Sequence, residues 1–211
     1  MRARIALALA SVAVPVVAGA TVMLPLSIED MSKEALAVVR ARVLQREADW
    51  DARHSRIYTH TRLEVLDTIH ARASLPKELL VRTLGGEVGE VGMKVAGTPI
   101  FADGEEVVVF LRADPEVATE YQVIGMAQGK LHVRRTAKGL AMVVPSLEGL
   151  AFVRPDQNGT LKATEEGPSD AEMALGVFEG RVKKAVESAP SPTAPALPAL
   201  PAPPSITPAA R

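Results

Sequence analysis

The chain has 211 residues, with 24 basic and 25 acidic side chains, no cysteine and a formal net charge of −1. With this charge balance, the protein has no strong long-range electrostatic field that would attract nucleic acid or anionic lipid. The lack of cysteine excludes disulfides, thiolate metal ligands and thiol catalysis, so the fold must depend on its hydrophobic core. We therefore expect the partner to be a protein or a component of the cell envelope, and not a nucleic acid.

Residues 1–20 have the pattern of a secretory signal peptide. Arg2 and Arg4 precede an apolar run, and the small residues Ala18, Gly19 and Ala20 form a cleavage pattern. We expect cleavage after Ala20 and export to the periplasm or the extracellular space. The alternative is an inner-membrane anchor formed by residues 5–26, because about 20 apolar residues suffice to span a bilayer.

Residues 27–187 are expected to form one β-rich domain. Ser27 or Ser32 is placed to cap a short helix at its start. Alternation of apolar and polar residues predicts strands at residues 39–44, 57–70, 78–86, 121–126, 129–135 and 139–144. The nearly continuous apolar run within residues 105–112 predicts a further strand, buried on both faces or central in a barrel. Arg40 and Arg42 on the first strand and Glu64 on the second favour pairing of these two as an antiparallel hairpin.

About seven strands with no helix between them indicate an antiparallel arrangement. The expected fold class is mainly β, a small antiparallel barrel or sandwich, OB-like or netrin-like, with one C-terminal helix over about residues 169–187. Ser169 or Asp170 is placed to cap this helix, which would pack on the barrel or cover an open edge. Residues 188–211 hold half of the chain's 16 prolines and predict an extended, disordered tail.

Several blocks of the sequence carry a resemblance to known families. The stretches EALAVVRARVLQREADW, IYTHTRLEVLDTI, VRTLGG, GTPIFADGEEVVVFL and YQVIGMAQGKLHV resemble recurring blocks of a family of uncharacterised exported bacterial proteins, over residues 35–133. The order of short helix, strand and long second strand is also similar to the netrin-like barrels, which include the metalloproteinase inhibitors and have an OB-type fold. Those inhibitors depend on cysteines that this chain lacks, so no inhibitory residue is carried over.

A glycine-rich stretch, residues 85–97, has almost the rhythm of a phosphate-binding loop, with Gly86, Gly89 and Gly92 at its centre. A dinucleotide or P-loop site needs a helix directly after the loop, and the P-loop also needs Gly-Lys-Ser/Thr. The sequence MKVAGTPIF follows instead, so nucleotide binding is not expected. The glycines either permit tight curvature of a barrel or keep a loop mobile for a partner.

Two further groups are candidates for partner contacts. Trp50, in the loop predicted at residues 47–56, suits a sugar ring or a peptide, or else plugs the barrel beneath that loop. Tyr58 follows between two histidines. The basic group Lys130, His132 and Arg134 could meet an acidic partner, or it marks a solvated edge strand that discourages aggregation.

No cofactor, metal or catalytic residue is predicted. The four histidines form no zinc motif, residues 156–160 form a polar turn and not a calcium loop, and no G-x-S-x-G motif occurs. The expected function is that of an exported, non-enzymatic binding or interaction protein. A protease inhibitor-like or maturation accessory protein is the alternative, and a hydrolase with a dispersed site is the third.

Overall fold

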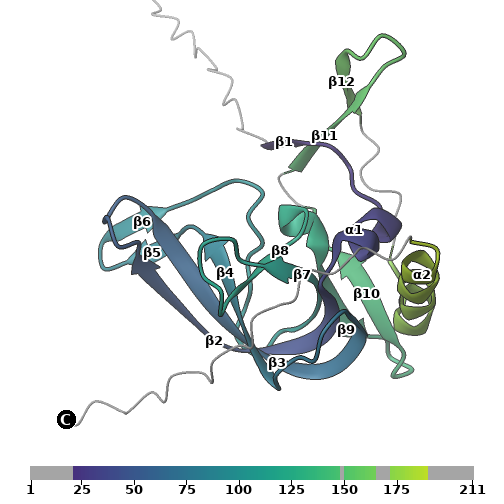
Figure 1. The fold of residues 1–211 in the computed structure, drawn as a ribbon, viewed down its shortest axis with the longest axis horizontal. Coiled ribbons are helices and arrows are strands. Elements are labelled where there is room, and N and C mark those ends of the chain that lie inside the picture. Colours follow the sequence, from purple (N-terminus) through teal and green to yellow (C-terminus); the bar gives the residue numbers. More distant parts are fainter. Residues whose placement is uncertain (1–20, 148–149, 165–171, 190–211) are drawn as a thin grey trace, which may run out of the picture.

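The structure is a computed structural model that describes residues 21–147, 150–164 and 172–189 (Figure 1). The predicted signal segment, the two predicted helix caps Ser169 and Asp170 and the tail from residue 190 lie outside the described residues. The elements in chain order are β1 Thr21–Met23, α1 Ile28–Glu34, β2 Ala37–Trp50, β3 Ile57–Ala71, β4 Glu78–Leu84, β5 Gly86–Val88, β6 Val91–Met93, β7 Glu106–Ala113, β8 Tyr121–Val123, a 3-10 turn Met126–Gly129, β9 Lys130–Arg135, β10 Ala141–Pro145, β11 Leu150–Pro155, β12 Leu161–Thr164, β13 Met173–Ala174 and α2 Leu175–Glu187.

Five strands close into a barrel, which decides between the two predicted architectures. Around the ring the order is β2, β3, β4, β8 and β7, and β7 pairs again with β2. All pairs are antiparallel except β4 with β8, which meet in parallel at Val81 and Tyr121. Register shifts in the β2–β3 pair, the first of them between Val38 and Val39, mark bulges that bend these long strands around the barrel.

β7 connects the barrel to the remaining strands of the sheet, β9, β10 and β13. Along one edge, its residues 111–113 pair with β8 and complete the barrel, while its residues 107–109 pair with β9. From β9 the sheet continues through β10 to β13. The prediction that residues 129–135 form an edge strand is therefore wrong, because β9 lies between β7 and β10.

Two hydrophobic cores lie on the two faces of this sheet. Alternate residues of β7 explain both: Val107, Val109 and Leu111 fill the barrel, whereas Val108 and Phe110 face the helices. All five side chains are fully buried, because both faces of this uninterrupted apolar strand are covered. Phe178 of α2 packs edge-on against Phe110, with ring centroids 5.7 Å apart, so the C-terminal helix covers the outer face of the sheet.

The helix ends differ partly from expectation. Ser27 caps α1 as predicted, since its hydroxyl oxygen accepts a hydrogen bond from the amide of Asp30, while Ser32 is buried and donates to the carbonyl of Ile28. The helix predicted from residue 169 begins later, at Leu175. Its N-cap is Ala174, which has no side-chain cap and belongs to the short strand β13.

A small separate sheet contains β1, β11 and β12, and Figure 1 shows it standing apart from the barrel. β1 pairs in parallel with β11, and the polar turn predicted at residues 156–160 joins β11 to β12. The carboxylate of Asp156 accepts hydrogen bonds from the amides of Asn158 and Thr160 in this turn. None of the helices in the described part of the chain combines the length and the apolar character needed to cross a membrane.

Candidate ligand-binding cleft

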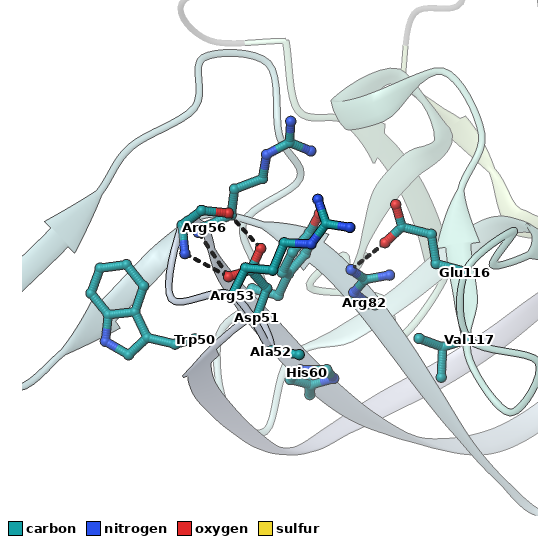
Figure 2. Close-up of a pocket in the computed structure, with 11 residues that line it drawn as sticks. Trp50, Asp51, Ala52, Arg53, Arg56, His60, Arg82, Glu116 and Val117 are labelled. Carbon is teal, nitrogen blue, oxygen red and sulfur yellow. Dashed lines mark hydrogen bonds and ion pairs between the residues drawn. The ribbon is translucent and has the colours of Figure 1, made fainter.

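An open cleft of about 560 Å³ lies where two loops meet over the β3–β4 side of the barrel. Its lining comes from Trp50 at the end of β2 and the 51–56 loop, from Tyr58 and His60 on β3, from Arg82 on β4, and from Glu116 and Val117 in the β7–β8 loop. Figure 2 shows Trp50 on one side, Glu116 and Val117 on the other, and the arginines between them.

The 51–56 loop is organised by one carboxylate. Asp51 accepts hydrogen bonds from the amides of Ser55 and Arg56 and from the Ser55 hydroxyl. These bonds, with that of the Ser55 hydroxyl the strongest, lower the pKa of Asp51 to about 2, so the carboxylate stays ionised at neutral pH. Its oxygens are therefore occupied within the loop.

Trp50 does not plug the barrel. Its indole stacks on the imidazole of His54, with ring centroids 5.9 Å apart and an interplanar angle of 9°. His54 reaches this position with a φ of 51°, a left-handed conformation that histidine tolerates better than most residues. The indole is half-buried and lines the cleft, so part of its surface is available to a ligand.

The floor of the cleft is set by the pairing of β3 with β4. His60 lies opposite Arg82 and Tyr58 lies opposite Leu84, which places Tyr58, His60 and Arg82 on one face. The guanidinium of Arg82 lies 3.6 Å from the centroid of the Tyr58 ring, a cation–π contact. Arg82 itself is buried, in keeping with its place beneath the cleft.

Arg82 is also tied to the β7–β8 loop by ion pairs. It contacts Asp114 at 3.2 Å and Glu116 at 2.7 Å. Burial would raise the pKa of Asp114, but hydrogen bonds from the amides of Glu116 and Val117 and from the Gln122 side chain outweigh it, so this pKa lies below its usual value. The fully buried Asp114 therefore joins the turn of the loop to β4 and fixes that wall of the cleft.

At the far side of the floor, His60 Nδ1 lies 3.0 Å from Glu120 Oε1. The Glu120 side chain is only 8% exposed, and its other oxygen has no hydrogen-bond partner among the described residues. This pair connects β3 to the end of the β7–β8 loop, so that loop is anchored to β3 by His60 and to β4 by Arg82.

Of the residues singled out from the sequence, Trp50 and Tyr58 lie in this cleft. Gly86, Gly89 and Gly92 belong to the β5–β6 hairpin and do not line it. A Cβ at Gly86 would lie 2.5 Å from Thr59 Oγ1, and Gly86 has a φ of 145°. Close packing against β2 and β3 therefore requires glycine at this position.

The basic group on β9 is not a free cationic surface. Lys130 is 2% exposed, donates to the carbonyl of Ile100 at 2.6 Å and forms an ion pair with Glu105 at 2.8 Å. His132 contacts the same Glu105 oxygen, and Arg134 pairs with Glu172. The expectation that Lys130 could meet an acidic partner is wrong, because its ammonium is buried and its charge is already paired.

Among the cleft residues that the sequence did not single out are Arg53, Arg56, Arg82 and Glu116. The signal for Glu116 was the Asp-Pro-Glu turn directly after the buried strand β7. No comparable signal marks Arg82, whose place depends on the register of β4 against β3. Within the described residues, no group of three or more histidines and carboxylates is placed to hold a metal ion.

Comparison with known proteins adds no relative. No protein-family model matches the chain, and no curated protein or solved structure is similar to it at a significant level.

Proposed function

We propose that this protein is a non-enzymatic binding module whose ligand occupies the cleft between the 51–56 loop and the β7–β8 loop. The observation that carries the proposal is the composition of the cleft. It contains the chain's single tryptophan, one of its two tyrosines and three arginines. Trp, Tyr and Arg are the residue types that contribute most to binding at protein surfaces.

The barrel topology supports the same position. In the five-stranded OB-type barrels, ligands lie over strands two and three and between the loops that join strands one to two and four to five. In chain order the barrel strands are β2, β3, β4, β7 and β8, so β3 and β4 are the second and third strands. The 51–56 loop joins the first strand to the second, and the β7–β8 loop joins the fourth to the fifth. The cleft therefore occupies the place that this architecture uses for binding.

We further propose that the protein is exported and acts in the bacterial cell envelope or outside the cell. The signal-peptide pattern of residues 1–20 supports export. The absence of cysteine makes the fold independent of the redox state of the compartment it reaches.

The lack of cysteine also provides a direct test. A single Ala52→Cys variant carries a photoreactive label in the cleft, and Lys138→Cys carries it in the turn between β9 and β10, which does not line the cleft. After illumination in the producing cell's envelope fraction, we expect an adduct with the label at position 52 and none at position 138. Equal labelling from both positions, or none from position 52, would overturn the proposal.

A further inference from the structure

Two arginines of the cleft are exposed and form no ion pair with any carboxylate of the described residues. Arg53 and Arg56 lie in the exposed loop, and within the described part of the chain neither has a carboxylate oxygen within 4.0 Å. Both Arg53 and Arg56 line the cleft, together with Tyr58. Guanidinium groups bind carboxylates and phosphates with two parallel hydrogen bonds, so this pair is suited to an anionic ligand.

The nearby carboxylates form no ion pair with these arginines among the described residues, but they do act on Arg56: after the interaction with Tyr58, the charges of Glu116 and Asp51 contribute to its raised pKa. Asp51 is occupied by the amides and hydroxyl of its own loop. Glu116 pairs with Arg82 at 2.7 Å, and Asp114 is buried beneath it. Arg82 is therefore compensated, while Arg53 and Arg56 keep their positive charge available.

The aromatic groups beside the arginines favour a polypeptide ligand. Trp50 presents part of its indole to the cleft, and Tyr58 is fixed from below by Arg82. Rigid aromatic groups flanked by arginines are the usual anchors of protein–protein contacts. Two aromatic groups separated by charged loops do not form the row of stacking platforms that a nucleic-acid strand requires.

We propose that the cleft binds an acidic peptide segment of a partner protein. Carboxylates of the segment pair with Arg53 and Arg56, and an apolar side chain between them packs on Trp50. This inference rests on the proposed function and specifies its ligand class.

The test uses Trp50 as its own probe, because it is the chain's only tryptophan. An octapeptide of alternating Glu and Leu, blocked at both ends, is titrated into residues 21–189 and into the full chain, with the matching Gln–Leu peptide as control. We expect saturable quenching or a spectral shift with the Glu peptide alone, weakening as salt rises.

The variants separate specific pairing from general charge attraction. Arg53→Gln with Arg56→Gln should weaken binding at least about tenfold, without changing thermal unfolding because both side chains are exposed. The control Arg154→Gln removes one positive charge from β11, outside the cleft, and should leave binding nearly unchanged. Equal loss in the double variant and the control would contradict the proposal.

Other anions distinguish the ligand class. An acidic hexasaccharide of uronic acids and an eight-residue oligothymidylate are titrated under the same conditions. Tighter binding of either one, or no binding of the Glu peptide, overturns the acidic-peptide proposal. If the label at position 52 still yields a specific adduct, the proposed function stands and only its ligand class is wrong.

Discussion

Asp51 determines the shape of the loop that lines one side of the cleft. Because its pKa is lowered to about 2 from an ordinary 3.8, the ionised carboxylate stabilises the folded loop at neutral pH. This stabilisation is fully present above pH 3.8 and is lost as the pH falls from 3.8 towards 2. Acid conditions should therefore loosen the loop even where the barrel remains folded.

Replacing Asp51 with Asn should reproduce this loosening at neutral pH. The amide cannot accept the same charge-assisted hydrogen bonds from Ser55 and Arg56. We expect faster hydrogen exchange at these two amides, measured by NMR, with little change at the barrel strands. Asp67→Asn on β3 is the control, since Asp67 is exposed and distant in sequence from the loop. Unchanged exchange in Asp51→Asn would show that the loop is held by other contacts.

Lys130 and Glu105 form a buried ion pair outside the cleft. Lys130→Ala would leave the carboxylate of Glu105, only 13% exposed, without its main counter-charge. We expect the free energy of unfolding to fall by about 3 kcal/mol, measured by urea denaturation. The double variant Lys130→Met with Glu105→Gln should recover part of this loss, because it removes the unpaired charge. A loss below about 1 kcal/mol for Lys130→Ala would show that the pair is not structurally important.

For single residues, the sequence singled out the two aromatic residues of the cleft, Trp50 and Tyr58, as candidates for partner contacts, but it did not single out the three arginines. Trp50 stood out because it is the only tryptophan and lies beside a charged stretch. Arg53 and Arg56 were visible only as part of a polar loop, and Arg82 only as one residue of a strand. The role of Arg82 depends on neighbours distant in the sequence, such as Asp114, which cannot be identified from the strand that carries Arg82.

Among the elements, the strands were the most predictable feature. The seven predicted strands correspond to β2, β3, β4, β7, β8, β9 and β10. Their alternating apolar residues are a local property, and Arg42 does lie opposite Glu64, at 3.6 Å, in the predicted hairpin. The start of α2 was missed because no capping side chain marks it and β13 directly precedes it.

Substituting alanine for glycine should change the free energy of unfolding in opposite directions at Gly86 and at Gly180. At Gly86 a Cβ meets Thr59 and the φ of 145° is unfavourable, so Gly86→Ala should cost roughly 1–3 kcal/mol. At Gly180, on the exposed side of α2, nothing lies within 4 Å of the added Cβ. Gly180→Ala should therefore stabilise by about 0.5–1 kcal/mol. Thermal and urea denaturation measure both, and the same sign for both would contradict this account.

In the whole molecule, residues 21–26 belong to the folded domain. Thr21, Val22 and Met23 pair with β11, and the Gln128 side chain accepts from the amide of Leu26 and donates to the carbonyl of Leu24. A bilayer anchor over residues 5–26 would break these contacts.

We therefore expect the mature protein to begin at Thr21. Intact-mass measurement and N-terminal sequencing of protein isolated from the producing cell would check this. Ala20→Arg, which disrupts the small-residue pattern, should block processing, whereas Val22→Ala should not. Recovery of the wild-type chain with residues 1–20 still attached would favour the anchor instead.

The sequence alone determined that this chain forms a mainly β domain with a C-terminal helix, because hydrophobic periodicity acts locally along the chain. It also determined that no disulfide contributes, since no cysteine is present. Only the tertiary structure decided that five strands close into a barrel and that β7 divides one edge between β8 and β9. Barrel closure brings the 51–56 loop to the β7–β8 loop, and the cleft exists because of that non-local pairing. Its arginines and aromatic groups therefore became a candidate site only once the register of the strands was known.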